Sequence, residues 1–147
     1  MIYIGIDPGK SGSIAFLPDH GTPWTVRTDS THADLVAAIE DVPIITFAQS
    51  PAMFALLEYV SSSPQMGVKS AFTFGQSFGA LEMLLAATGI PFERITPRKW
   101  QAAMGCLTGG DKNVSKRRAQ ELFPSLKVTH RNADALLLAE LARRTQR

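Results

Sequence analysis

Short apolar segments separated by turn residues dominate the beginning of the chain. Apolar positions run from Met1 to Leu17, are broken at Asp7-Pro8-Gly9 and resume at Ile14, which predicts a β-hairpin. A third short strand is expected at Trp24–Arg27. The first part of the chain therefore indicates three consecutive strands.

Helical spacing of apolar residues appears next. Asp29-Ser30-Thr31 offers helix-capping side chains, and apolar residues then recur at helical spacing as far as Val42-Pro43. Between Met53 and Val60, apolar residues occupy both odd- and even-numbered positions, as expected of a strand covered on both faces. Further along we expect a loop at Ser61–Gly67, a helix at Ser77–Ala87 and a strand at Pro91–Ile95. A helical turn around Trp100 and a break at Thr108-Gly109-Gly110 should follow. The last two elements are a basic helix at Lys116–Leu122 and a final helix at Ala133–Arg144.

This order of elements predicts a mixed α/β sheet of about five strands with helices on both faces. It is the order of the RNase H-like fold, although other α/β domains share parts of it. A chain of 147 residues is of ordinary size for one domain, so residues 1–147 are expected to form a single domain.

Composition narrows the class of protein. The apolar runs are far shorter than the roughly 20 residues that span a bilayer, and the chain starts with no basic segment followed by an apolar core. We therefore expect a soluble, cytoplasmic protein, bacterial or acting in the host cytoplasm if phage-encoded, with no membrane partner. The single cysteine, Cys106, is interpreted as a small apolar core residue.

Charge is distributed unevenly along the chain. Residues 1–93 hold three Lys or Arg against nine Asp or Glu, whereas residues 94–147 hold twelve against four. The net charges of −6 and +8 are hidden in an overall +2. This asymmetry favours a C-terminal half that faces a polyanion such as nucleic acid, with solvated basic helices as the alternative.

Three carboxylates stand out by their surroundings. Asp7 ends an apolar strand, Glu58 is the one charge inside an apolar strand, and Asp134 begins an Ala- and Leu-rich helix. Each has an ordinary explanation: a turn residue, a solvent-facing strand end, or an acid favoured by the helix dipole. Together they match the carboxylate set with which proteins hold paired Mg²⁺ ions for phosphodiester hydrolysis. His130 lies four residues before Asp134 and shares its helix face if the helix reaches that far.

Five motifs in order resemble those of the RuvC-type Holliday junction resolvases, especially the compact phage and prophage forms. They are Ile4-Gly5-Ile6-Asp7-Pro8-Gly9 with Ser11-Gly12, Leu57-Glu58-Tyr59-Val60, the run from Ser70 to Gly79, Thr96-Pro97-Arg98-Lys99-Trp100, and the run from Ala133 to Glu140. They extend across nearly the whole chain.

The resemblance implies the roles of several residues. Asp7, Glu58 and Asp134 would be the catalytic acids and would bind two Mg²⁺ ions, for which Mn²⁺ can substitute. The family usually has a fourth ligand one turn before the last acid. Here Thr129-His130-Arg131-Asn132 contains no carboxylate, so His130 is the candidate ligand.

The same resemblance places Lys112 and Lys116 near the catalytic cleft, where a lysine would neutralise the scissile phosphate or the leaving oxygen, with a solvated helix face as the alternative. Arg117 and Lys69 are further candidates for DNA contacts. Phe72 or Phe74 is a candidate for stacking at the junction centre, although such aromatic residues are more often part of a core.

The implied activity is structure-selective hydrolysis of phosphodiester bonds in four-way or branched DNA by a homodimer. The helix at Ser77–Ala87, with Leu81, Leu84 and Leu85, is the expected dimer surface. A catalytically weak or inactive junction-binding protein is the alternative. A sugar-kinase or actin-like ATPase would need a second similar lobe, for which the chain has no room, so no nucleotide cofactor is expected.

Overall fold

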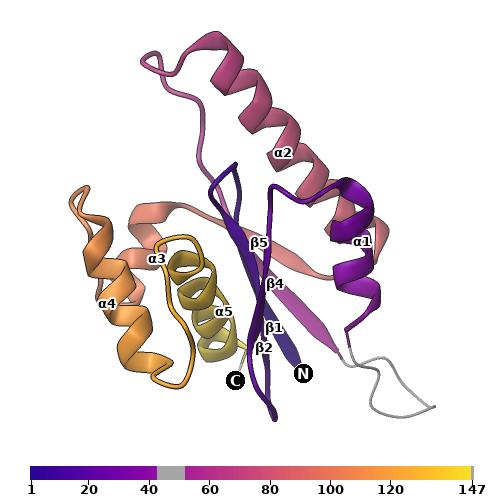
Figure 1. The fold of residues 1–147 in the computed structure, drawn as a ribbon, viewed down its shortest axis with the longest axis vertical. Coiled ribbons are helices and arrows are strands. Elements are labelled where there is room, and N and C mark those ends of the chain that lie inside the picture. Colours follow the sequence, from indigo (N-terminus) through magenta and orange to yellow (C-terminus); the bar gives the residue numbers. More distant parts are fainter. Residues whose placement is uncertain (43–51, 147) are drawn as a thin grey trace.

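The computed structural model describes residues 1–42 and 52–146, and Figure 1 gives the arrangement of their elements. The elements in chain order are β1 (Ile2–Asp7), β2 (Ser13–Pro18), β3 (Trp24–Arg27), α1 (His32–Glu40), β4 (Met53–Glu58), α2 (Val68–Ala87), β5 (Phe92–Ile95), α3 (Pro97–Ala103), α4 (Lys112–Leu122) and α5 (Ala133–Thr145).

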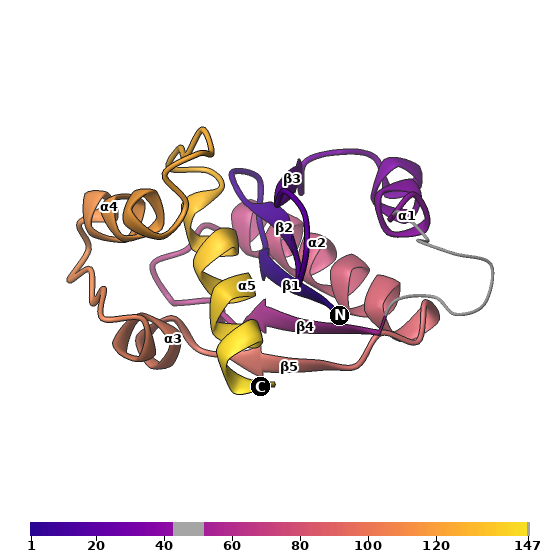
Figure 2. The same cartoon turned by 90° about the horizontal axis from the view of Figure 1, so that it is seen from below.

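The strands form one mixed sheet in the order β3-β2-β1-β4-β5. β1 pairs with β2 and β2 with β3 in antiparallel fashion, whereas β4 runs parallel to both β1 and β5. Helices cover both faces of this sheet (Figure 2). The predicted RNase H-like α/β fold, with five strands and helices on both faces, is therefore confirmed.

Two apolar cores lie on opposite faces of the sheet. Side chains alternate between the faces of a strand, so Tyr3 and Leu56 belong to the core under α5, while Ile4 and Leu57 belong to the core under α1 and α2. Cys106 is 1% exposed in the α5-side core, which confirms its interpretation as an apolar core residue.

The contact between β1 and α5 is unusually close because of Gly5. A Cβ atom at Gly5 would lie less than 3.0 Å from the Ala135 carbonyl oxygen and from the Ala139 nitrogen. Any side chain here would push α5 away from the sheet. A glycine in the middle of β1 therefore sets the distance between the end of that strand and the first turn of α5.

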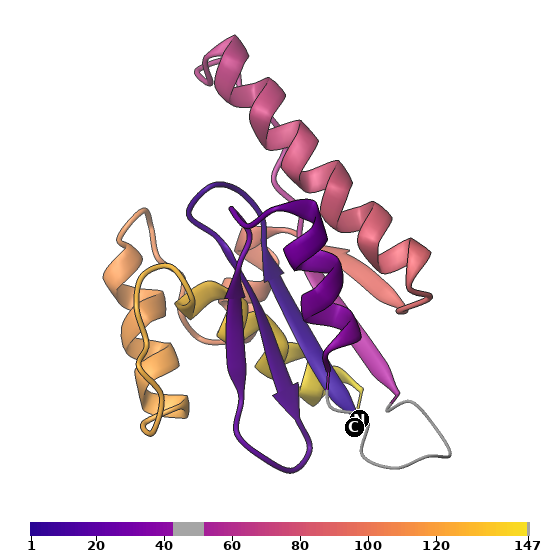
Figure 3. The same cartoon turned by 45° about the vertical axis from the view of Figure 1, so that its right-hand side comes forward.

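Two predicted helices begin earlier than the sequence pattern suggested. α2 starts at Val68 rather than Ser77, and Gly75 and Gly79 lie inside it. Both glycines are exposed, and a Cβ added at either would have no atom within 4 Å. α4 starts at Lys112 rather than Lys116, because the Asp111 side chain caps it by accepting a 2.9 Å hydrogen bond from the Asn113 backbone. The N-terminal half of α2 consequently projects beyond the sheet (Figures 1 and 3).

The prediction that the leucines of the helix at Ser77–Ala87 form a dimer surface is wrong. Leu81, Leu84 and Leu85 are buried against the sheet in the core under α1 and α2, so they are unavailable to a partner.

The first helix, α1, is capped as expected, with Thr31 and Asp34 forming a capping box. Pro43, its predicted limit, lies outside the described residues. Among the described residues, no helix combines the length and the apolar character needed to span a membrane.

Candidate metal-binding active site

The three predicted acids come together at one end of the sheet. Asp7 ends β1 and Glu58 ends β4, and these two strands are parallel with Ile6 opposite Leu57, so the two carboxylates occupy the next positions along both strands. Because side chains alternate between the two faces of a strand, Asp7 and Glu58 both lie at positions that face α5. Asp134 lies in the first turn of α5, which Gly5 holds close to β1. Three separate elements thus deliver one carboxylate each to the same place.

The pKa values of all three carboxylates are raised. Burial, followed by the charges of Glu58 and Asp134, raises the pKa of Asp7 to about 8. Burial also raises the pKa of Glu58 and of Asp134, with the charge of Asp134 adding to the effect on Glu58. A cluster of acids that is desolvated and mutually repelling is stabilised by a cation.

Glu58 is held by a residue to which the sequence pattern gave no role. The indole Nε1 of the fully buried Trp100 donates a 2.8 Å hydrogen bond to Glu58 Oε1. This hydrogen bond lowers the pKa of Glu58 and opposes the effect of burial. The Thr96-Pro97 start of α3 gave the position of this helix, but nothing in the pattern linked Trp100 to Glu58.

Lys112 and His130 flank the acids. Both line a cleft of about 560 Å³ together with Asp7, Asp134 and Ser115. The charge of Lys112 lowers the pKa of all three acids, and His130 and the Ser115 hydroxyl lower that of Asp134. His130 is exposed and precedes α5 rather than lying on it. The first residue of α4 therefore places an ammonium group beside the carboxylates.

The donor set fits a hard divalent cation. Carboxylate oxygens are the ligands that Mg²⁺ and Mn²⁺ prefer, and Asp134 Oδ1 is buried with no hydrogen-bond partner among the described residues. No three described His, Cys, Asp or Glu side chains stand close enough to form a finished ligand set. The side chains would therefore have to move for the three acids to hold one ion together.

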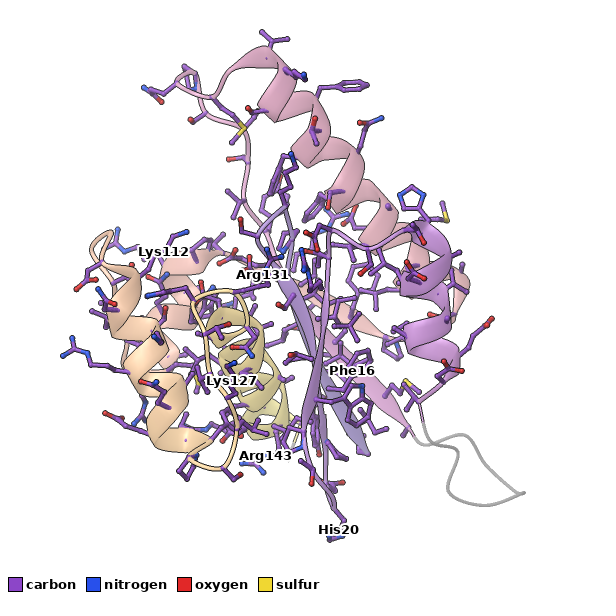
Figure 4. All side chains as sticks on the ribbon, in the orientation of Figure 1. Phe16, His20, Lys112, Lys127, Arg131 and Arg143 are labelled. Carbon is purple, nitrogen blue, oxygen red and sulfur yellow. The ribbon has the colours of Figure 1, made fainter. Side chains whose placement is uncertain are left out.

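The loops around the cleft are tied together by Arg131. Its guanidinium lies 3.4 Å from Asp29 and donates a 3.3 Å hydrogen bond to the Lys10 carbonyl, while its own carbonyl accepts a 3.1 Å hydrogen bond from Ser13. These contacts join the β1–β2 connection to the segment that carries His130. Figure 4 shows Arg131 and Lys112 toward the same end of the molecule, away from Arg143.

Of the remaining residues predicted to contact DNA, some lie at the cleft and others lie outside it. Phe74 lines the cleft, whereas Phe72 is 67% exposed and is not among the lining residues. Lys116 and Arg117 lie about a turn beyond Lys112 on α4 and do not line the cleft either. Lys69 lies on the first turn of α2, beside a neighbouring hollow.

Comparison with known proteins identifies the fold. No protein-family model and no curated protein sequence matches the chain. A structure of Thermus thermophilus RuvC is 16% identical with a TM-score of 0.67, and the match covers 99% of this chain and 97% of that one. T. thermophilus RuvC in complex with Holliday junction substrate is 16% identical with a TM-score of 0.62, covering 95% and 90%. The chain therefore has a RuvC-like fold.

Proposed function

We propose that this chain is a metal-dependent endonuclease that hydrolyses phosphodiester bonds in four-way or branched DNA. The observation that carries the proposal is the convergence of Asp7, Glu58 and Asp134 at one sheet end, with Lys112 beside them. Burial raises the pKa of all three acids, and carboxylates that are desolvated close together favour bound cations. A phosphodiester nuclease supplies these cations as metal ions.

Two Mg²⁺ ions, or Mn²⁺ in their place, would supply charge neutralisation and an activated water when bound by the three acids. Lys112, which is exposed and lines the cleft, would contact the scissile phosphate or the leaving oxygen. His130 would complete the ligand set on the side of Asp134. The Trp100 hydrogen bond would keep one Glu58 oxygen fixed while the other turns toward the cleft.

Branched DNA is the substrate class best supported. One solved structure with this fold is a RuvC in complex with Holliday junction substrate. The net charge of +8 on residues 94–147 gives this chain a region suited to a polyanion, and Lys112 belongs to it.

A homodimer follows from the two strands that a four-way junction presents, and we assign its contact to the outer face of α2. Val68, Phe72 and Met83 are 89%, 67% and 67% exposed there. Gly75 and Gly79 occupy the same face at helical spacing, with open space around them. Light scattering of Met83→Glu should then report a monomer where the unaltered protein is a dimer.

The decisive experiment uses a labelled four-way junction in EDTA, Mg²⁺ and Mn²⁺. Asp7→Asn should lower the cleavage rate at least about 1000-fold while junction binding in EDTA is retained, because one metal ligand and one negative charge are removed. Asp41→Asn, exposed at the end of α1, is the matched control and should cleave normally. Wild-type protein that binds junctions without cutting them in either metal would instead identify a junction-binding module.

A further inference from the structure

His130 lies in a short turn that leads into α5 and is closed by its own hydrogen bonds. Asn132 Oδ1 accepts hydrogen bonds from the Thr129 backbone over 2.7 Å and from the Thr129 hydroxyl over 3.2 Å. The Ala133 nitrogen donates a 3.1 Å hydrogen bond to the Thr129 carbonyl. We call residues 129–132 the His130 turn. His130 itself is exposed, so its position beside the acids depends on the contacts that hold this turn against the rest of the fold.

Ser13 anchors the His130 turn to the sheet. It is the first residue of β2 and lies directly opposite Asp7 in the pairing of β1 with β2, so both side chains are on the face that carries α5. Ser13 is 1% exposed, and its hydroxyl donates a 3.1 Å hydrogen bond to the Arg131 carbonyl. A buried hydroxyl needs a hydrogen-bond partner. Here the partner is the residue that follows His130, so the turn is fixed directly beside Asp7.

The side chain of Arg131 forms a second anchor at the same end of the sheet (Figure 4). Its guanidinium donates a 3.3 Å hydrogen bond to the Lys10 carbonyl and lies 3.4 Å from Asp29. Asp29 is in turn held by Arg27 through hydrogen bonds of 2.8 and 2.6 Å, and Arg27 pairs with Ser13 in the register of β2 and β3. The backbone and the side chain of Arg131 are therefore both tied to the ends of the first three strands.

From these contacts we propose that Ser13 and Arg131 are positioning residues for His130. They hold its imidazole within reach of a metal ion bound by Asp7 and Asp134, with which His130 lines the cleft. The inference rests on the proposed nuclease function and says how its fourth ligand is held. A ligand on an exposed turn must be ordered before it can bind an ion, and fixed outer partners remove much of that cost. Both positioning residues act through the place of the turn.

The test uses Mn²⁺ as the probe and protein without DNA, so that contacts between Arg131 and phosphates cannot contribute. Pulsed electron paramagnetic resonance detects the nitrogen of an imidazole that is bound directly to Mn²⁺. The unaltered protein should show this nitrogen signal, and His130→Gln should lose it while the acids still bind the ion. Ser13→Ala should lose most of the signal, and Ser13→Thr, which keeps a hydroxyl, should restore it.

Calorimetric titration with Mn²⁺ separates positioning from general stability. Ser13→Ala should weaken Mn²⁺ binding about tenfold, as expected when a metal ligand loses an outer partner. In the His130→Gln background the same change should have no further effect, because the residue through which Ser13 acts is already gone. The control is Thr88→Val, which removes a hydroxyl that donates a 2.7 Å hydrogen bond to the Leu84 carbonyl, outside the lining of the cleft. It should bind Mn²⁺ normally.

Arg131→Lys tests the second anchor with the charge unchanged. A lysine ammonium lacks the planar fork with which the guanidinium reaches the Lys10 carbonyl and Asp29 together. The nitrogen signal and the Mn²⁺ affinity should fall, but less than in Ser13→Ala, since the backbone carbonyl of residue 131 is still anchored. Arg131 is only partly buried, so this variant tests the proposal even if Ser13→Ala does not fold. Thermal unfolding of each variant checks that its fold is intact.

The outcomes separate this inference from the proposed function. A full nitrogen signal and normal Mn²⁺ affinity in folded Ser13→Ala and Arg131→Lys, in a protein that cuts junctions, would overturn the positioning role and leave the nuclease intact. Equal losses of affinity with and without His130, or no nitrogen signal in the unaltered protein, would overturn it as well. A signal that depends on Ser13 in a protein that never cuts would support the inference and reject the nuclease. Unaltered protein that binds no Mn²⁺ would reject both.

Discussion

The two faces of the sheet differ in how closely a helix packs against them. We call the face under α5 the close face and the face under α2 the open face. On the α5 side, Gly5 brings backbone against backbone, and the acids at the strand ends meet Asp134 in the first turn of the helix. On the α2 side, the long helix packs through its C-terminal half while its N-terminal half projects past the sheet (Figure 3). Under the proposed function, the close face would carry the catalytic groups and the open face would supply the surface for a second copy of the chain.

Gly5→Ala should have the largest effect, because it attacks the close face directly. The added methyl group would overlap the backbone of α5 at Ala135 and Ala139, where no flexible side chain is available to yield. We expect the free energy of unfolding to fall by about 4 kcal/mol or more, as for severe overpacking. Chemical denaturation measures it, and a variant of near wild-type stability would show that α5 can move away from β1.

The acid cluster on the close face should make the metal-free protein less stable as pH rises. Asp7 has a pKa of about 8 in the folded protein against an ordinary 3.8, so the folded state binds this proton more tightly than the unfolded state does. The stabilisation is complete below about pH 4 and is lost as pH rises toward 8, so this group lowers the melting temperature by several degrees over that range.

Mg²⁺ should reverse this trend by stabilising the ionised cluster at pH 8. Asp7→Asn should flatten the profile in EDTA and reduce the gain from Mg²⁺. Thermal unfolding in EDTA and in Mg²⁺ between pH 5 and pH 9 provides the measurement. A melting temperature in EDTA that rises steadily to pH 9 for the wild type, in step with Asp7→Asn, would contradict a mutually repelling acid cluster.

The sequence carried more information about the close face than about the open one. Strand periodicity and turn residues were enough to predict β1, β2, β4 and α5, and therefore the elements that carry Asp7, Glu58 and Asp134. The start of α2 was missed because Gly75 and Gly79, which are unfavourable in a helix, lie inside it. The contact between Glu58 and Trp100, which are 42 residues apart in the sequence, is visible only in three dimensions.

Trp100→Phe tests whether the close face positions Glu58 for metal binding. Phenylalanine preserves most of the buried volume but removes the 2.8 Å hydrogen bond to Glu58 Oε1. We expect Mg²⁺ affinity to fall about tenfold, the lower end of the effect of losing an outer-shell partner. Calorimetric titration with Mg²⁺ gives the affinity without any cleavage assay.

The molecule contains a matched control for this change. Trp24 stacks on Phe16 in the other core, with the centroids 5.0 Å apart, so Trp24→Phe also removes an indole but touches none of the acids. Its Mg²⁺ affinity should equal that of the unaltered protein. Equal losses in the two variants would mean that Trp100 acts through general stability and not through Glu58.

Gly75→Ala should have the smallest effect, and the opposite sign to Gly5→Ala. Gly75 lies within α2 with open space around it, so a methyl group meets no atom and removes a residue that disfavours helix. We expect a gain of about 0.5 to 1 kcal/mol in the free energy of unfolding at low protein concentration. If the outer face of α2 is the dimer contact, the same methyl group separates the two helices, and the gain becomes a loss as concentration rises. Denaturation midpoints across protein concentration therefore test at once the open character of this face and the partner assigned to it.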